Sequence, residues 1–137
     1  MDTLIAQSVH DLYWNRDLNC ARTCLLTLGK IFDITIESQT FQAAVGLHGA
    51  GGYRAQCGLV EGALMFIGIY FHHLGKSETE IIDLCYNFAD AFTNEFSSLR
   101  CYDLRPGGFT PEDEPHLCED LTVRGIEFVK EFIMANR

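Results

Sequence analysis

Apolar residues recur along most of the chain at helical spacing, and one stretch lacks a polar face altogether. Within residues 59–71 the only charged side chain is that of Glu61, so we expect a helix that is buried nearly all round. The remaining apolar stripes are one-sided, which is typical of helices that cover a core. They predict helices over residues 3–14, 20–32, 40–47, 77–98 and 115–136.

Capping residues and breakers indicate where these helices begin and end. Asn19 is a predicted N-cap for the second helix, and Ser77 with Glu80 has the spacing of a capping box. Pro115 suits the first turn of the last helix. Residues 105–115 are rich in proline, glycine and charge, and are predicted to form a loop.

No alternating apolar pattern of useful length predicts a strand, so the predicted fold is all-α. We expect a compact helical bundle of about five to six helices around the buried central helix. At 137 residues the chain fits one domain, spanning residues 1–137, and is long enough to bury a core.

The charge balance excludes two classes of partner. The formal net charge is −9, the pI is near 4.8 and no basic cluster occurs, whereas nucleic acids and anionic membrane surfaces require a positive footprint. Residues 1–17 lack the basic region and the uninterrupted apolar run of a signal peptide. The central apolar stretch is short for a membrane span and carries Glu61, His72 and His73. We therefore expect a soluble cytoplasmic protein without a membrane span.

A glycine-crowded loop delivers Cys57 to the start of the central helix. Unpaired backbone N–H groups and the helix dipole at that position favour thiolate over thiol, and Arg54 adds positive charge nearby. Burial and the negative charge of Glu61, one turn later, oppose the thiolate. We expect the helix terminus to have the larger effect, so that the pKa of Cys57 is lowered. The loop glycines that allow unusual backbone angles before Cys57 are Gly46, Gly49, Gly51 and Gly52.

The other five of the six cysteines differ in their setting. Cys24 and Cys85 lie on apolar helical stripes, where cysteine behaves as a small hydrophobe, and we expect them to be packing residues. Cys20 and Cys24 are four apart, a spacing that can offer two metal ligands but suits a disulfide poorly. Cys101 and Cys118 lie near helix ends beside loops, where packing and function are both open interpretations.

Several further groups have two interpretations each. Gly58 and Gly62 share one helix face, which favours tight internal packing, with a homodimer contact as the alternative. Glu61 could accept a proton from Cys57, pair with a cation, bind a metal or simply face water. His48 and His116 could join a site, since they lie close in sequence to Cys57 and Cys118. His72 and His73 are predicted to be helix-end residues only.

The order of cysteines and glycines resembles the C_GCAxxG_C_C family of redox-active proteins over residues 19–132. The resemblance rests on Cys20, the glycine-rich loop, the run CGLVEG that leads into ALMFIGI, and two later cysteines. Leu59 stands where the motif usually has Ala, and Glu61 stands where a small or hydroxyl residue is expected. The four motif cysteines implied by the resemblance are Cys20, Cys57, Cys101 and Cys118, and the motif glycines are Gly58 and Gly62.

The resemblance also implies what the protein works with. Family members are soluble proteins of similar size, often encoded beside transporters, which implies an unknown redox partner or a transporter-associated protein as partner. Cys24 and Cys85 match no motif position, which supports their packing role. The resemblance supplies neither a substrate nor a cofactor.

Three functions compete on these residues. The preferred hypothesis is a thiol–disulfide redox protein, a thiol oxidoreductase, in which Cys57 attacks and one of Cys20, Cys101 or Cys118 resolves. The second is a metal protein in which the same four cysteines bind zinc or an iron–sulfur cluster. The third is a non-catalytic accessory protein with packing cysteines. The first two require the four motif cysteines to gather in space, and we expect that they do.

Overall fold

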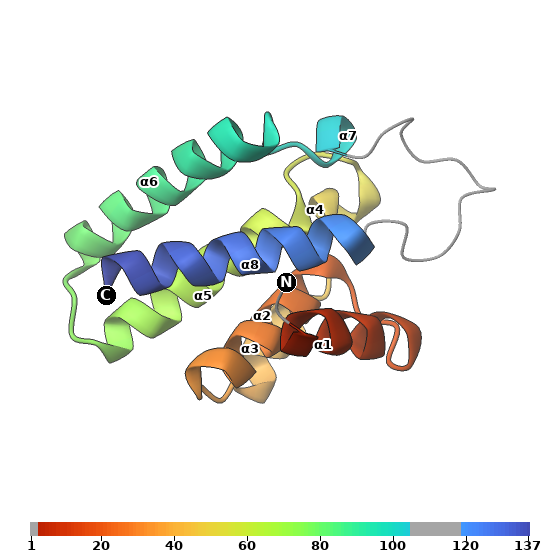
Figure 1. Ribbon diagram of the computed structural model, residues 1–137, viewed down its shortest axis with the longest axis horizontal. Helices are drawn as coiled ribbons and strands as arrows, with labels where there is room; N and C mark the ends of the chain where they lie inside the picture. Colours follow the sequence, from red (N-terminus) through yellow and green to blue (C-terminus); the bar gives the residue numbers. More distant parts are fainter. Residues whose placement is uncertain (1–2, 105–118) are drawn as a thin grey trace.

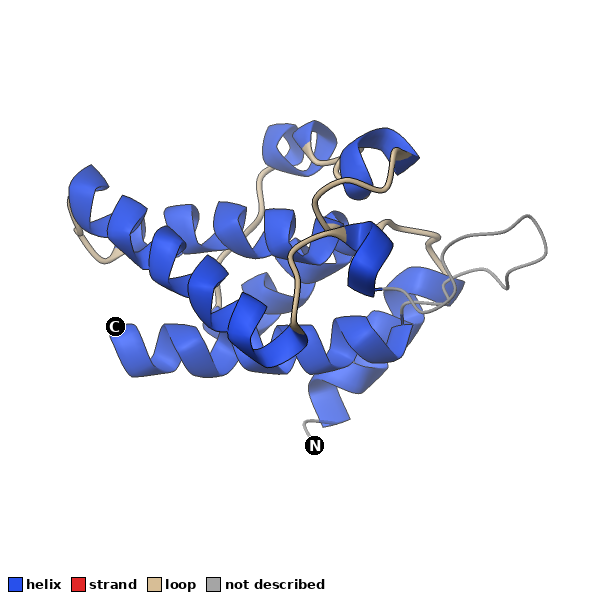
Figure 2. Cartoon of the chain, turned by 90° about the horizontal axis from the view of Figure 1, so that it is seen from above, coloured by secondary structure: helices blue, strands red, loops and turns tan. Residues whose placement is uncertain are grey.

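The computed structural model describes residues 3–104 and 119–137. This part of the chain consists of helices and loops (Figure 2), and its β-structure is limited to an isolated antiparallel bridge between Gln56 and Arg100. The all-α prediction is therefore confirmed. The helices are α1 (Thr3–Trp14), α2 (Cys20–Phe32), α3 (Ser38–Ala43), α4 (Gly49–Gly52), α5 (Gly58–His73), α6 (Glu78–Phe96), α7 (Cys101–Leu104) and α8 (Glu119–Asn136).

The predicted bounds agree best where a capping side chain fixes them. Asn19 caps α2 by accepting a hydrogen bond from the backbone N–H of Arg22, at 2.9 Å. Ser77 and Glu80 form the predicted capping box at the start of α6, since each side chain accepts from the other residue's backbone N–H. Both predicted caps are confirmed.

The predictions were less accurate for the short segments. The helix expected over 40–47 is α3, which begins and ends earlier, at Ser38 and Ala43. Neither α4 nor α7 was predicted, because each has only four residues and a single turn carries no helical period. The predicted loop over 105–115 and the start of the last helix at Pro115 lie outside the described residues.

Helices α5 and α8 lie between α6 on one side and α1 to α3 on the other (Figure 1). Helix α2 packs along α5, and α1 joins α2 to α8. Every residue from 59 to 71 is buried or half-buried, and the exposed fraction of Ile67 is 0%. The prediction of a central helix buried nearly all round is confirmed.

An aromatic cluster joins α6 to α8 across the top of this core. Ring centroids in the cluster lie 4.4–6.2 Å apart, in both stacked and edge-on arrangements, and such pairs stabilise beyond their buried area. All five rings lie on the apolar stripes that predicted helices over residues 77–98 and 115–136. The cluster consists of Phe88, Phe92, Phe96, Phe128 and Phe132.

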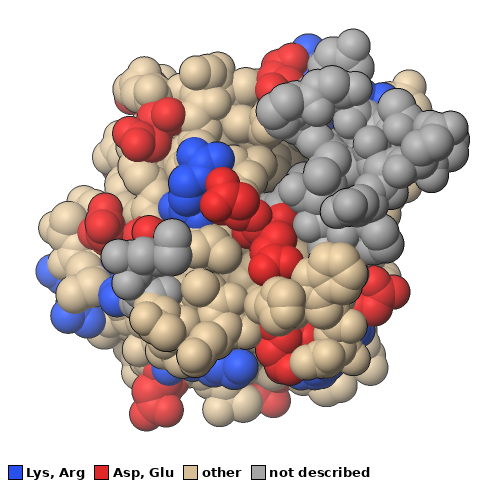
Figure 3. Space-filling view, turned by 45° about the vertical axis from the view of Figure 1, so that its right-hand side comes forward, with Lys and Arg blue, Asp and Glu red and all other residues tan. Residues whose placement is uncertain are grey.

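The surface carries charges of both signs. Figure 3 shows one face of the molecule, where the Lys and Arg side chains of the described chain lie among Asp and Glu side chains rather than in one broad basic area. Among the helices in the described ranges, none combines the length and the apolar character needed to cross a bilayer.

Candidate functional site

The site is built around the N-terminus of α5, where Cys57 is the N-cap residue. Its backbone is extended, with φ −60° and ψ 132°, and its own side chain makes no capping hydrogen bond to the first turn of the helix. The Cys57 side chain is therefore placed beside the first N–H groups of α5, which have no acceptor one turn earlier within the helix. Cys57 is 6% exposed, so only a narrow edge of it reaches solvent.

A short antiparallel pairing holds the segment that contains Cys101 alongside the segment that contains Cys57. The backbone N–H of Cys57 donates to the carbonyl oxygen of Leu99 at 2.8 Å, and the N–H of Cys101 donates to that of Ala55 at 2.7 Å. These two bonds flank the bridge between Gln56 and Arg100. The start of α7 is therefore fixed next to the start of α5, and Figure 1 shows α7 close to the α4 loop.

The glycine-rich loop lies against the start of α7, where it contacts Cys101. Gly49, Gly51 and Gly52 all have positive φ, as the glycine content predicted. A Cβ on Gly49 would lie 3.4 Å from the Cβ of Cys101 and 3.2 Å from the backbone of Arg54. Gly49 thus allows the loop, Arg54 and Cys101 to meet at close range.

Cys20 reaches the same place from the start of α2. A Cβ on Gly58 would lie 3.2 Å from the Cβ of Cys20 and only 2.3 Å from the carbonyl oxygen of Leu47, so the position admits only glycine. Asn19 secures this contact, because its side-chain amide donates to the carbonyls of Ala44 and Val45 at 3.0 and 2.9 Å. The Asn19 side chain therefore both caps α2 and binds it to residues 44 and 45, which lead into the glycine-rich loop.

Gly62 extends this close approach by one turn. A Cβ there would lie 2.7 Å from the carbonyl oxygen of Ala21 and 3.0 Å from the Cβ of Cys24. The face that Gly58 shares with Gly62 is thus occupied by α2 within the same chain. The internal-packing interpretation of these glycines is confirmed.

Three of the four predicted site cysteines, Cys20, Cys57 and Cys101, therefore border the first turn of α5. The fourth, Cys118, lies outside the described residues. No disulfide joins any two cysteines of the described chain. Within the same ranges, no three side chains of His, Cys, Asp or Glu are placed to hold a metal ion together.

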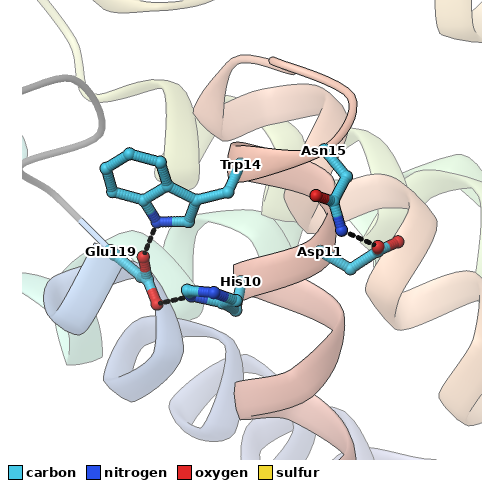
Figure 4. Close-up of polar contacts among 5 residues, drawn as sticks. All are labelled: His10, Asp11, Trp14, Asn15 and Glu119. Atoms are coloured by element: carbon cyan, nitrogen blue, oxygen red, sulfur yellow. Dashed lines mark hydrogen bonds and ion pairs between the residues drawn. The ribbon is translucent and has the colours of Figure 1, made fainter.

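The described chain resumes after Cys118 at Glu119, which is held by two side chains of α1. His10 Nδ1 lies 3.0 Å from one carboxylate oxygen of Glu119, and Trp14 Nε1 donates to the other (Figure 4). Tyr13 and Thr122 share a further buried hydrogen bond of 2.7 Å between α1 and α8. The start of α8 is therefore fixed against the end of α1, and residues 15–19 connect α1 to Cys20.

Cys24 is fully buried, as predicted for a packing residue, but it is also a neighbour of the site. Burial raises the pKa of its thiol above the ordinary value, and the negative charges of Cys57 and then Cys20 raise it further. Cys85 is half-buried on α6, and burial alone raises its pKa. The i, i+4 spacing from Cys20 was the signal that could have placed Cys24 at the site.

The other candidate residues contribute less to the site. The backbone of His48 contacts Gly58, although the His48 side chain is exposed. Glu61 is half-buried in the first turn of α5. His72 and His73 are exposed in the last turn of that helix, as predicted. His116 lies outside the described residues.

Fold and site together define an all-α protein in which cysteines from separate segments lie around one helix N-terminus. Residues 18–132 match the model of the family described as "Putative redox-active protein (C_GCAxxG_C_C)". The chain therefore belongs to this family, as the cysteine pattern predicted. No curated protein and no solved structure matches it.

Proposed function

We propose that the protein is a cytoplasmic thiol–disulfide oxidoreductase that uses its motif cysteines. The observation that carries the proposal is the placement of Cys20, Cys57 and Cys101 around the first turn of α5, although they lie far apart in the sequence. Family membership supports a redox role in general terms. Cys118 joins the proposal as the fourth motif cysteine.

Cys57 is proposed as the attacking thiol. It occupies the N-cap of a 16-residue helix, where first-turn N–H groups and the dipole stabilise a negative charge by about 0.3–2 kcal/mol. Cys20 and Cys101 are half-buried and so more exposed than Cys57. They border the narrow edge through which a substrate disulfide would reach the Cys57 sulfur.

The proposed reaction transfers two electrons from protein thiols to a substrate disulfide. The Cys57 thiolate attacks one substrate sulfur, forms a mixed disulfide and expels the other substrate sulfur as a thiolate, which takes a proton from solvent. Cys20, Cys101 or Cys118 then attacks the Cys57 sulfur, and the second substrate thiol leaves. The substrate is reduced and the protein holds one new disulfide, which a redox partner or transporter-associated protein would reduce.

The experiment is reversible oxidation of the reduced full-length protein in glutathione buffers of graded potential. We expect two thiols to disappear together, and peptide mapping to find Cys57 in the new disulfide. Cys57→Ser should abolish this paired loss. Cys85→Ser is the matched control, because Cys85 lies on α6 away from the site, and it should leave the titration unchanged.

Other outcomes distinguish the competing functions. Paired thiol loss that persists in Cys57→Ser would overturn the role of Cys57. No reversible oxidation at all would favour an accessory protein with packing cysteines. Zinc or iron that copurifies in proportion to the protein and protects the four motif cysteines from alkylation would favour the metal protein.

A further inference from the structure

Cys24 lies beside the proposed site without belonging to the family motif. Helices α2 and α5 run in the same direction, because Cys20 contacts Gly58 and, one turn later on both helices, Cys24 contacts Gly62. Ring contacts of Phe32 with Phe66 and Tyr70 continue this parallel packing toward the other end. Cys24 is thus one helical turn below Cys20 on the same face of α2.

The direction of the helical side chain brings its sulfur closer to Cys57. Cα–Cβ bonds tilt toward the N-terminus of a helix, and the N-terminus of α2 is the end at which Cys20 meets Gly58 and Cys57. Gly58 and Gly62 have no side chains, so neither position places a Cβ on the surface of α5 between the Cys24 sulfur and the start of that helix. The electrostatic influence of Cys57 on Cys24 exceeds that of Cys20 and agrees with this placement.

Burial restricts Cys24 to very few reaction partners. Its exposed fraction is 0%, so it cannot meet a substrate or a second protein itself. A disulfide with Cys20 is unfavourable, because Cβ atoms at i and i+4 of a helix are about 5–6 Å apart, whereas a disulfide needs about 3.5–4.5 Å. Cys57, at the N-cap of α5, is free of this helical constraint, and its charge acts on Cys24 more strongly than that of Cys20.

We propose that Cys24 is a second resolving thiol that reacts only with Cys57, inside the protein. This inference rests on the proposed function, since it requires Cys57 to form a mixed disulfide first. A buried resolving thiol would release a bound substrate even while Cys20 and Cys101 are oxidised or occupied.

The proposed step balances without a further reactant. Burial still opposes ionisation of Cys24 in the mixed disulfide, but Cys57 no longer carries a charge there, so one of the two charges that add to this opposition is gone. The Cys24 sulfur attacks the Cys57 sulfur, the bond from Cys57 to the substrate sulfur breaks, and the departing substrate thiolate takes the proton of Cys24. The products are a Cys24–Cys57 disulfide and a free substrate thiol.

The test uses dithiodipyridine, a small disulfide whose released thiopyridone absorbs light. One full-length variant carries Cys20→Ser, Cys85→Ser, Cys101→Ser and Cys118→Ser and so retains Cys24 and Cys57. Its matched control carries Cys24→Ser in addition. We expect the first variant to release two equivalents of thiopyridone and to end with a Cys24–Cys57 disulfide, and the control to release one equivalent and keep the probe bound.

The two proposals fail in different ways. One equivalent from the first variant, with the probe still on Cys57, would overturn the role of Cys24 and leave the proposed function standing. Release of no thiopyridone from either folded variant would overturn both. If the multiple variants do not fold, the unmodified chain is oxidised with diamide and mapped: a Cys24–Cys57 peptide pair supports the inference, and Cys57 linked only to other cysteines contradicts it.

Discussion

Cys57 is subject to opposing influences from its own helix. The N-terminus of α5 stabilises a thiolate, whereas the burial of Cys57 and the carboxylate of Glu61 in the first turn destabilise it. These effects are similar in size, and the pH midpoint of Cys57 alkylation shows which of them is larger. Reactivity and access can be separated, because access sets the rate at high pH while ionisation sets the pH midpoint of alkylation.

We predict that Cys57 is alkylated fastest of the six cysteines at neutral pH, with a pH midpoint below the free-thiol value of about 8.5. Glu61→Gln should lower this midpoint further, because it removes a negative charge one turn away. The Cys57 thiolate should be stabilised by about 0.2–1 kcal/mol, which corresponds to an alkylation rate at neutral pH that is up to about fivefold higher. Iodoacetamide labelling followed by mass spectrometry measures both.

Glu78→Gln is the control for this prediction. Glu78 begins α6 near the far end of α5, and its side chain is 87% exposed, so its removal should leave Cys57 labelling unchanged. A Cys57 midpoint above about 8.5 would mean that burial dominates and that another motif cysteine attacks.

The buried thiol of Cys24 should make stability depend on pH in the alkaline range. Its pKa is raised in the folded state, so above about pH 8.5 the unfolded chain loses this proton while the folded chain keeps it. The contribution of this thiol to the free energy of unfolding should therefore be constant below that pH. Above it, the contribution should fall by at most about 1.4 kcal/mol per pH unit. Urea unfolding of the wild type and of Cys24→Ala, from pH 7 to 10, measures the difference. Equal slopes would show that Cys24 ionises as readily when folded.

At the scale of the helices, the contact between α2 and α5 depends on glycines that lack a Cβ, Gly58 among them. We predict that Gly58→Ala destabilises the protein by more than the about 1–3 kcal/mol typical of overpacking, because the new Cβ meets the backbone of Leu47, which cannot rotate away. Gly68→Ala is the matched control on the same helix. A Cβ there meets nothing within 4 Å, so it should be neutral or stabilise by up to about 1 kcal/mol. Equal melting temperatures for the two variants would contradict the predicted difference between these two glycine positions.

A second close contact joins α5 to α8. A Cβ on Gly125 would lie 2.1 Å from Cδ2 of Leu59, a side chain that is 1% exposed and so has little room to move. We predict that Gly125→Ala costs about 1–3 kcal/mol in the wild type but stabilises the Leu59→Ala variant by about 0.5–1 kcal/mol, since only the better helix propensity then remains. Chemical unfolding of the four proteins of this double-mutant cycle measures the coupling, and simple additivity would contradict it.

The bounds of the helices could be predicted where the determining signals are local. Asn19 and the pair Ser77 and Glu80 cap their helices through residues three positions away, so the sequence contains the whole interaction. The pairing of Ala55 and Cys57 with Cys101 and Leu99 could not be predicted, because so short a segment shows no alternation. The contact of Cys24 with Gly62 depends likewise on which face of α2 meets the glycines of α5.

For the molecule as a whole, the central helix determines whether a core exists. Ile67→Asp would place a charge at a fully buried position, and the protein should unfold, because the cost is a large part of the total stability of a domain, about 5–15 kcal/mol. Ile82→Asp is the control, since Ile82 is 67% exposed on α6 and should change stability by less than about 0.5 kcal/mol. Circular dichroism melting compares the two. An unchanged melting temperature for Ile67→Asp would disprove the central position of this helix.

The contact of Leu59 with Gly125 matches α8 to α5 within this chain. A relative with alanine in place of Leu59 would lack the carbons that fill this space, so its last helix would have room for a larger residue than glycine. The two positions should therefore co-vary among homologues, with glycine accompanying leucine. An α8 grafted from such a relative would collide with Leu59, and this α8 placed in that relative would leave a void. Chimaeras between family members should therefore be more stable when both residues are exchanged together than when either is exchanged alone.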